Sequence, residues 1–484
     1  MTTVIKPRIF DNGKREVTPE DDTSLSISER FAAFADAFDL DGVPAQVVER
    51  VKLNILDAIG IGLASTTYDF AHRTVTAMRG LGGEGDHAVI GLPLRLPLRD
   101  AALVNGTLIH GLDFDDTHSG GVIHASASAV PTMLGAGVAH GVTGAEALSA
   151  YLIAVEASAR IGIAANGGFH RMGYHPTGMV GAFGCALAAS WLAESTRRQM
   201  ADAQGIVLSQ AAGSLEFLED GAWTKRMHPG WAAVSGITAA ALAKQGFPGP
   251  RQAYEGRYGL YRTHLGPDAE VDWVAVTAGL GREWEVMKVA FKPYPACHFN
   301  HAFADAALAL KREHGLKPDD IQSVVARIAE TEIPVVCEPE AAKRRPKSSY
   351  EAQFSTHYTI AAAMVRDRFT LAELDPEAYT DPAILALCDR VTYEIDPASA
   401  FPSYYSGEVV IRTTDGRTLK HREQKNRGSA GNPLTSAEVE AKFHGNAARA
   451  VNRRAADRLL NEIMTLEEAE DLTDLEEALG TAQQ

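Results

Sequence analysis

Residues 178–194 read GMVGAFGCALAASWLAE, a long apolar run dominated by Ala and Gly, whose small side chains let helices approach closely. Three stretches of the same kind precede it: AALVNGTLIHGL at 101–112, ASASAVPTMLGAGVAHG at 125–141 and ALSAYLIAVEASARIG at 147–162. Together they predict that the chain is mostly α-helical up to about residue 275, a packed array of helices around one apolar core.

The helical region extends toward the N-terminus to about Ser26. There Ser26-Ile27-Ser28-Glu29 predicts a capping box, in which a hydroxyl caps the first turn and the Glu carboxylate reaches back. Thr143-Gly144-Ala145-Glu146 repeats the pattern. Residues 44–65 place apolar side chains at steps of three and four, as on a buried helical face. Residues 1–25 mix charges, Pro and Gly without periodicity and are expected to form a polar arm.

The pattern changes after about residue 283. SVVARI at 323–328, RVTYEID at 390–396 and EVVIRTTDG at 408–416 alternate apolar with polar residues, as strands do, and helical stretches lie between them. We therefore expect a mostly α chain with an α+β part. Its expected divisions after the arm are a helical domain over 26–280, a smaller α+β lid domain over 285–425, and C-terminal helices over 430–484 that pack back on the helical domain.

The charge balance excludes several classes of function. The chain has 484 residues with 46 Lys and Arg against 62 Asp and Glu, a formal net charge of −16. Nucleic-acid binding needs a basic surface that neutralises phosphates, so no nucleic-acid partner is expected. No uninterrupted apolar run reaches the roughly 18 residues of a membrane-spanning helix, and the N-terminal residues are too polar for a signal peptide. Because the four cysteines form no CxxC pair, we expect reduced thiols and a cytoplasmic protein without a membrane partner.

The densest polar segment, HGLDFDDTHSGGVIHAS at 110–126, interrupts the apolar region. Carboxylates and imidazoles are costly to bury unless they are paired or used. Three interpretations stay open. The acids can cap the next helix beside ordinary histidines, or Asp113 with Asp115 or Asp116 can hold Mg²⁺, although no second acidic metal motif follows. In the third interpretation, Asp113 orients a histidine that moves a proton without a metal.

Three further polar segments carry cationic or titratable side chains. They are GYHPTGMVGAFG with His175, DGAWTKRMHPGWAA with Lys225 and His228, and FKPYPACHFNHAFADAA with Lys292 and His298. His175 precedes a helix N-terminus, whose positive potential disfavours the charged imidazole. Lysines and histidines gathered in an acidic protein suggest a pocket for a small polyanion.

Motifs for common cofactors are missing from the sequence. No P-loop, GxSxG elbow or HExxH pattern occurs. The GxG of Gly60-Ile61-Gly62 lies inside a helical period without a third glycine or a preceding strand, so it indicates a close helix crossing more than a nucleotide site. We expect neither a metal nor an organic cofactor.

These segments, in this order and together with YEAQFSTHYTIAAA at 350–363 and GNPLT at 431–435, resemble the MmgE/PrpD family. That family includes 2-methylcitrate dehydratase, cis-aconitate decarboxylase and iminodisuccinate epimerase. The resemblance covers about residues 28–475. It implies an all-α domain built from both chain ends plus a smaller α+β lid domain, a homodimer, and activity on di- or tricarboxylates without a metal or organic cofactor.

The resemblance also implies site residues. Carried over from the motifs of cis-aconitate decarboxylases, they are Asp113, Thr117, His124, His175 and Lys225, with Lys292 opening the last segment. The chain departs from the decarboxylase pattern at two places. In the first segment, one more residue separates Thr117 from His124 than in the decarboxylases, and His118 stands where the animal enzymes have Trp. In the last segment, the position of the decarboxylase histidine falls on Cys297, beside His298. Because the first segment also lacks the NDTWxxxEWGHPSDN pattern of dedicated 2-methylcitrate dehydratases, the chain resembles the cis-aconitate decarboxylase-like branch more closely.

We therefore expect a lyase that transfers a proton next to a carboxylate of its substrate, by decarboxylation or dehydration. The expected catalytic residues are the acid–base pair His124 and His175, with Asp113 and Thr117 fixing the geometry. The expected substrate-binding residues are Lys225, Lys292, His228 and His298. The alternatives are an epimerase of a dicarboxylate such as iminodisuccinate and, from another class, a polycarboxylate-binding protein without catalysis.

Overall fold

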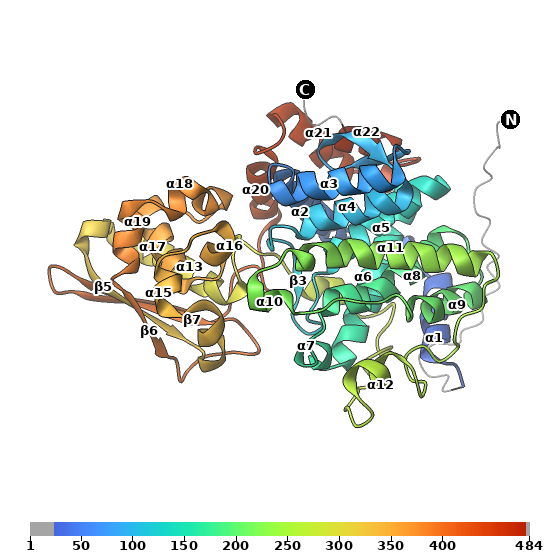
Figure 1. Ribbon diagram of the computed structural model, residues 1–484, viewed down its shortest axis with the longest axis horizontal. Helices are drawn as coiled ribbons and strands as arrows, with labels where there is room; N and C mark the ends of the chain where they lie inside the picture. Colours follow the sequence, from blue (N-terminus) through green and yellow to red (C-terminus); the bar gives the residue numbers. More distant parts are fainter. Residues whose placement is uncertain (1–23, 481–484) are drawn as a thin grey trace.

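The computed structural model describes residues 24–480. Figure 1 shows two parts of unequal size: a large helical domain that also contains the last helices of the described chain, and a smaller domain in which helices cover a sheet. The expectation of a mostly α chain with an α+β part is confirmed. The polar arm expected over residues 1–25 lies almost wholly outside the described residues.

The helical domain is built around α8 (Pro176–Leu192), every residue of which is buried. It packs against α5 (Ala125–His140), α6 (Gly144–Ala164), α9 (Arg197–Val207) and α11 (Thr224–Lys244). The close approach of α8 and α11 requires glycine, because a Cβ on Gly236 would lie 2.5 Å from the Cβ of Cys185. The other long helices of this domain are α1 (Ile27–Asp36), α2 (Ala45–Ser65), α3 (Asp69–Gly82) and α4 (Leu98–His110).

Helix α6 is long and apolar enough, by length and composition alone, to cross a membrane, but 94% of its apolar window is buried inside the domain. It is therefore a core helix of this fold. Its N-terminus has the predicted capping box, in which the Thr143 hydroxyl accepts from the Glu146 backbone and the Glu146 carboxylate accepts from the Thr143 backbone. Ser26 and Glu29 form the same box at α1, so both predicted boxes are confirmed.

Residues 87–96 form a β-hairpin that the sequence pattern does not predict. β1 (His87–Val89) pairs antiparallel with β2 (Leu92–Leu96) around Gly91, whose φ of +71° is easily adopted by glycine. The two strands are too short for an alternation of apolar and polar residues to stand out, so periodicity misses them.

The smaller domain holds a four-stranded sheet in the order β6-β5-β7-β8. Its strands are β5 (Ile321–Ile328), β6 (Val391–Ile395), β7 (Gly407–Thr413) and β8 (Thr418–Glu423). β5 and β6 run in parallel, and the other neighbours are antiparallel. α13 (His301–His314) packs against β7 and β8, and α17 (Thr356–Arg366) packs on α13.

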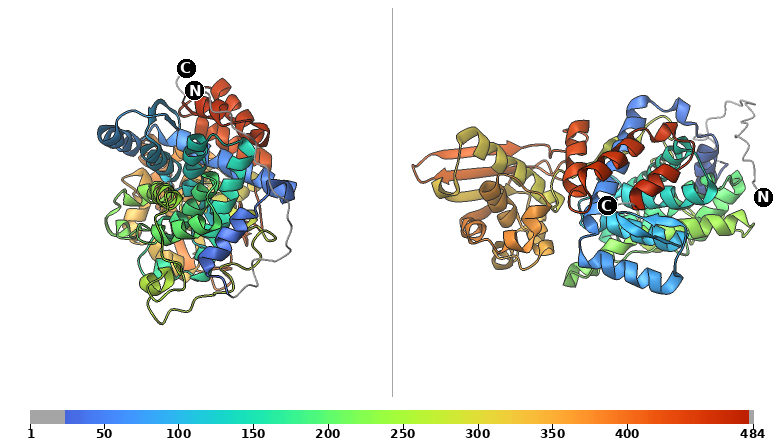
Figure 2. Two further views of the ribbon diagram at one scale, coloured as in Figure 1. Left: turned by 90° about the vertical axis from the view of Figure 1, so that its right-hand side faces the viewer. Right: turned by 90° about the horizontal axis from the view of Figure 1, so that it is seen from above.

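After β8 the chain returns to the helical domain, as Figure 2 shows. The returning helices are α20 (Ser436–Ala447), α21 (Arg453–Met464) and α22 (Thr473–Gly480). α20 and α21 pack on α2, and α22 packs on β1. A Cβ on Gly60 of α2 would lie 2.9 Å from Cδ2 of Phe443, so the GxG motif serves a close helix crossing.

A short ladder connects the two domains. β3 (Thr117–His118) pairs antiparallel with β4 (Val289–Ala290), which places the end of the DFDDTH segment beside the chain that enters the smaller domain. Nε2 of His118 lies 3.0 Å from Oε2 of Glu285, and its Nδ1 accepts the backbone N–H of Gly121. His118 therefore holds this junction together.

Glu332 of the smaller domain is 1% exposed, and neither carboxylate oxygen has a hydrogen-bond partner within residues 24–480. Burial raises its pKa to about 8. The folded state therefore keeps a proton that the unfolded chain releases near its usual pKa of 4.5, so this group reduces stability as pH rises from 4.5 to 8. In urea unfolding between pH 5 and 9, we expect Glu332→Gln to remove a slope of up to about 1.4 kcal/mol per pH unit.

The exposed Glu330, two residues away, provides the matched control. Glu330→Gln should keep the pH dependence of the parent. If Glu332→Gln and the parent lose stability in parallel over this range, the Glu332 carboxyl is already ionised in the folded protein and the prediction is wrong.

Candidate active site

A cavity of about 280 Å³ lies between the helical domain and the smaller domain. Its helical-domain wall includes Asp113, Thr117, His124, His175 and Lys225. Its other wall includes Lys292, Cys297, His298, Tyr350 and Tyr405. Seven of the eight residues expected from the sequence thus meet in one cavity, and the eighth, His228, lies behind it.

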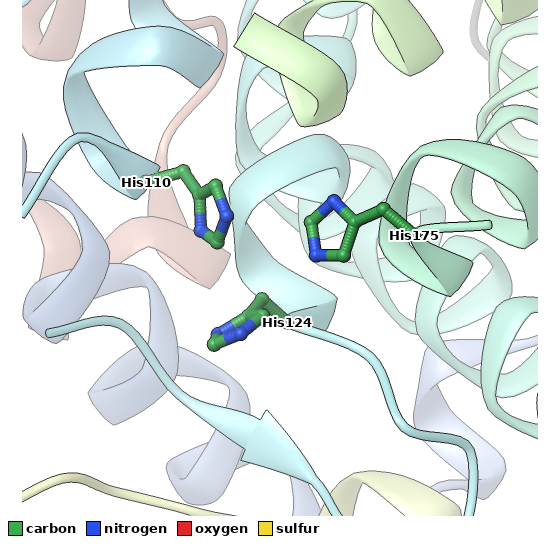
Figure 3. A group of neighbouring side chains, drawn as sticks. All are labelled: His110, His124 and His175. Atoms are coloured by element: carbon green, nitrogen blue, oxygen red, sulfur yellow. The ribbon is translucent and has the colours of Figure 1, made fainter. Parts of the chain in front are cut away.

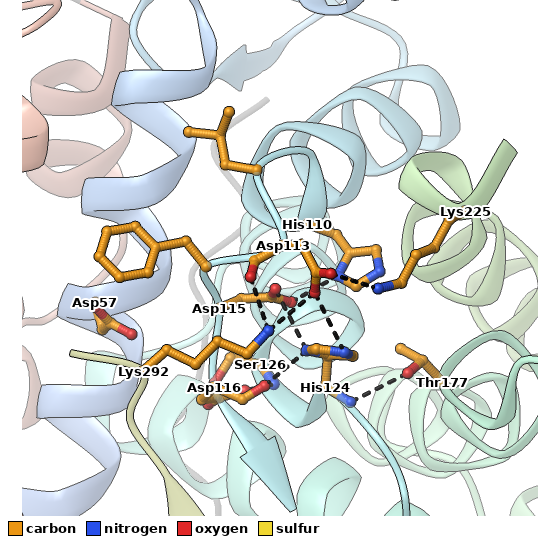
Figure 4. A network of polar contacts seen from close by, with 12 residues as sticks. Asp57, His110, Asp113, Asp115, Asp116, His124, Ser126, Thr177, Lys225 and Lys292 are labelled. Carbon is orange, nitrogen blue, oxygen red and sulfur yellow. Dashed lines mark hydrogen bonds and ion pairs between the residues drawn. The ribbon is translucent and has the colours of Figure 1, made fainter. Parts of the chain in front are cut away.

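Asp113 bridges two lysines at the centre of the site (Figure 4). The Lys225 Nζ lies 2.9 Å from Oδ2 of Asp113, and the Lys292 Nζ lies 2.9 Å from Oδ1 and 2.7 Å from the Asp113 carbonyl oxygen. Burial alone would raise the pKa of Asp113, but Lys225 and Lys292 hold it well below its usual range. One carboxylate is therefore shared by two ammonium groups, and these three side chains together carry one positive charge.

The turn that follows α4 presents the acidic residues in two directions. Asp113 has a φ of +50°, a conformation that Asp and Asn adopt more readily than most residues, and its carboxylate meets the lysines. Asp115 and Asp116 face the protein interior. Oδ2 of Asp115 lies 2.8 Å from Nδ1 of His110, and Oδ1 of Asp116 accepts the backbone N–H of Ser126 at 3.1 Å. The interior acids thus fix the turn, and of the three only Asp113 lines the cavity.

His124 is the N-cap residue of α5. Its Nδ1 lies 2.9 Å from the carbonyl oxygen of Asp116, which can only accept, and 3.3 Å from Oδ1 of Asp115, so we place a ring proton on Nδ1. In a neutral ring the unprotonated nitrogen is then Nε2, which lies 3.8 Å from Oδ1 of Asp113. The His124 backbone N–H donates to Oγ1 of Thr177 at 3.1 Å, which ties α5 to α8. In its neutral form the ring offers a base to the cavity.

Figure 3 shows His110, His124 and His175 as a compact group. The His110 ring centroid lies 4.6 Å from that of His124 and 5.5 Å from that of His175. Burial lowers the pKa of His110 to about 4 in spite of its bond to Asp115. Burial, together with His110 and Lys225, holds the pKa of His175 well below its usual range. His110 and His175 are therefore neutral imidazoles at pH 7.

His228 of α11 lies behind His175, and their Nδ1 atoms are 3.0 Å apart. His228 lines a second cavity of about 570 Å³ on the other side of the pair. A substrate in the first cavity would meet His175 before His228. His228 is therefore one layer removed from the substrate that it was expected to bind.

Two buried side-chain atoms in residues that line the cavity have no hydrogen-bond partner in the described part of the chain. They are Oγ1 of Thr117 and Nε2 of His298. The His298 ring stacks on Tyr405 with centroids 4.9 Å apart, which fixes its orientation. Burial raises the pKa of the Cys297 thiol to about 11, so this cysteine is protonated at neutral pH and is a poor nucleophile.

Four titratable residues of the site were not predicted from the sequence: His110, His170, Tyr350 and Tyr405. His110 ends an apolar helix five positions before Asp115, and a buried imidazole there needs a partner. Tyr350 opens the YEAQFSTHY segment, which is one of the segments that carry the family resemblance. Tyr405 is one of 13 tyrosines, and no local pattern distinguishes it from the others.

Two groups of described side chains have ligand atoms close enough for a metal ion, within 4.8 Å of one another. They are His110, His124 and His175, and Asp113, Asp115 and His124. In the second group both oxygens of Asp113 already bind ammonium groups. In the first, burial lowers the pKa of His110 and His175, Lys225 adds to the effect, and the Lys225 charge would equally repel a cation. The electrostatics of the cavity therefore favour an anion.

Comparisons with known proteins agree with the motifs. The chain matches the models of the MmgE/PrpD N-terminal domain over residues 29–272 and the MmgE/PrpD C-terminal domain over residues 294–468. It is 28% identical to cis-aconitate decarboxylase of Homo sapiens over 466 residues, which are 92% of this chain and 93% of that protein. The cis-aconitate decarboxylase-like protein oryM of Aspergillus oryzae is 26% identical over 455 residues, 90% of this chain and 93% of that protein. Cis-aconitate decarboxylase of Aspergillus terreus is 25% identical over 459 residues, with 91% and 93% covered. The resemblance inferred from the motifs is confirmed, and the chain belongs to the MmgE/PrpD family.

Proposed function

We propose that this protein is a cofactor-independent lyase that acts on a small di- or tricarboxylate, with the decarboxylation of cis-aconitate as the first reaction to test. The observation that carries the proposal is the pair of ammonium groups, Lys225 and Lys292, that share the one carboxylate of Asp113 beside neutral imidazoles. Charge-assisted hydrogen bonds from such groups suit a substrate carboxylate. The relatives named cis-aconitate decarboxylase support this class of chemistry.

In the proposed reaction, the bond between a CH₂ carbon and its carboxylate breaks and CO₂ leaves. The released electron pair forms a new terminal double bond, and the pair of the old double bond moves to the carbon next to a remaining carboxylate. Lys225 and Lys292 stabilise the charge that builds on that carboxylate. The carbon then takes one proton, for which His175 is the proposed donor. In a dehydration or an epimerisation, Nε2 of His124 would first remove a proton.

Proton NMR in D₂O, with chelator-treated protein and a panel of citrate, 2-methylcitrate, cis-aconitate, malate, tartrate and iminodisuccinate, tests the proposal. A new vinyl signal with loss of CO₂ or water supports a lyase and names its substrate. Deuterium entry with inversion and an intact carbon skeleton would replace the proposal by an epimerase. Binding of the panel without any turnover would indicate a polycarboxylate-binding protein.

Removal of metal ions should leave the activity unchanged, because ammonium groups already occupy both oxygens of Asp113. Dialysis against EDTA, followed by assays with and without added Mg²⁺ or Zn²⁺, measures this. A loss of activity that an added ion restores would overturn metal independence, whereas a loss that no ion restores would indicate damage to the protein.

The proposal includes the homodimer that is usual in the family and a cytoplasmic location. All four cysteines lie within the described residues as free thiols, which agrees with a reducing compartment. Sedimentation equilibrium of the purified protein tests the dimer, and fractionation of the source cells tests the location.

A further inference from the structure

His175 and His228 share a contact that the steps above do not use. Their Nδ1 atoms lie 3.0 Å apart, so one Nδ1 carries a hydrogen and the other accepts it. Burial lowers the pKa of His228 to about 4 and that of His175 well below its usual range. Both rings are therefore neutral at pH 7, and a single proton lies between them.

The pair spans the wall between two cavities. His175 lines the substrate cavity, and His228 lines the second cavity of about 570 Å³. Phe217 lines both cavities, and its ring centroid lies 6.2 Å from that of His175 and 6.0 Å from that of His228. On another side, a Cβ on Gly213 would lie 3.4 Å from Nδ1 of His228. The shared proton is thus enclosed by packed groups, and the two imidazoles connect the cavities.

Proton donation by a neutral His175 raises a problem of charge. If the ring gives its Nε2 proton to the substrate carbon, an imidazolate remains unless Nδ1 gains a proton in the same step. Starting from an imidazolium is unfavourable, because His175 is 5% exposed and lies near Lys225. A substrate that fills the cavity also separates His175 from water on that side. The proton that Nδ1 of His175 gains therefore has to come from the side of the ring that faces His228.

We propose that His228 is the outer member of a two-imidazole relay that carries a proton from the second cavity to His175 while substrate fills the first. The relay rests on the proposed function. At the start, His228 carries the Nδ1 proton and His175 carries the Nε2 proton. His175 gives its Nε2 proton to the substrate carbon, and the shared proton moves from His228 to Nδ1 of His175. Nε2 of His228 takes a proton from water in the second cavity, and the hydroxide left there is neutralised by the solvent buffer.

The step balances without a charged ring. One proton enters from the second cavity, one is added to the substrate carbon, and the two imidazoles exchange tautomers. Decarboxylation of a tricarboxylate consumes one proton per turnover, and the relay supplies it. The starting tautomers return when the product leaves: Nε2 of His175 takes a proton from the water that refills the substrate cavity, the shared proton moves back to Nδ1 of His228, and Nε2 of His228 releases its proton into the second cavity. His228 is therefore a positioning and proton-supplying residue that acts through His175.

Two variants of His228 test the relay. His228→Asn keeps an N–H that can donate to Nδ1 of His175 but cannot pass a proton on. We expect its kcat to fall about 10- to 100-fold with KM nearly unchanged. In His228→Ala, free imidazole can enter the vacated space from the second cavity, and kcat should recover with saturation. 1-Methylimidazole, which has a single basic nitrogen, should not restore kcat. His72→Ala, at an exposed histidine of α3, is the control that should not respond.

A parent enzyme that turns over substrate while His228→Asn keeps the full kcat would overturn the relay and leave the proposed function standing. Equal rescue by imidazole and 1-methylimidazole would also overturn it. If the parent converts no acid of the panel, ¹⁵N-histidine NMR decides the relay separately. A coupling between the two Nδ1 atoms across a shared proton at pH 7, absent from His228→Asn, supports the relay, and its absence from the parent refutes it.

Discussion

Replacing His175 by Asn should lower kcat by about 10²- to 10⁴-fold, the contribution typical of a positioned acid or base. His175 is the N-cap residue of α8, and Asn is favoured at such positions, so the helix should still begin at Pro176. The amide offers no second nitrogen that can give a proton to the substrate carbon. Because the lysines stay in place, substrate affinity should largely persist. Single-turnover kinetics and calorimetric binding at one pH separate the two quantities.

His124→Asn completes this experiment, since His124 is also an N-cap residue and lines the same cavity. In a decarboxylation only the proton donor is essential, so His175→Asn should be the slower variant. In a dehydration or epimerisation both variants should lose activity to a similar degree. The exposed His72→Asn is the matched control. Parent-like turnover by His175→Asn would show that His175 is not the acid.

Replacing Lys225 by Met should raise KM about 10²-fold, because a charge-assisted hydrogen bond to a substrate carboxylate contributes about 1.5–3 kcal/mol. The substitution removes one of the two ammonium groups that Asp113 shares, so the combined charge of these three side chains falls from +1 to 0. Met keeps most of the length of the lysine stem and preserves the packing of α11. Steady-state kinetics over a range of substrate concentrations measures the change.

Lys317→Met, which removes an exposed charge from the smaller domain, is the control for the loss of net charge alone. It should leave KM unchanged. If Lys225→Met binds substrate as well as the parent does, Lys225 serves only to hold Asp113, and the anion-binding part of the proposed function would rest on Lys292 alone. Thermal unfolding of both variants distinguishes a lost contact from a damaged fold.

The fold was predictable where the signal is local. Capping boxes at Ser26 and Thr143 need only four residues each, and the Ala- and Gly-rich run of α8 identifies a helix that neighbours approach closely. The contacts of Lys225 and Lys292 with Asp113 could not be predicted from a local signal. These residues come from the start of α11, the chain after β4 and a turn with positive φ. Residue types predicted an anion pocket, but only the tertiary structure gives the pairing.

His228 illustrates the limit of reasoning from spacing. Lys225 and His228 stand three residues apart on α11, so they share a helix face and appeared equivalent as ligands. The long lysine stem reaches the Asp113 carboxylate in the cavity. The shorter histidine stops at His175, which stands between it and the substrate. The difference is one of side-chain reach, which a sequence motif does not encode.

The ladder of β3 and β4 has a consequence for how such an enzyme can diversify. Because Thr117 lies on β3 and Lys292 follows β4 closely, both belong to the junction, whereas Tyr350 and Tyr405 come from the smaller domain beyond it. If the lysines bind the substrate as proposed, carboxylate binding and recognition of the rest of the substrate rest on different parts of the chain. A chimera that takes residues 300–425 from a relative should keep its affinity for carboxylates while preferring a different acid. Substitutions confined to the smaller domain could then change the preferred substrate of the enzyme without changing its reaction.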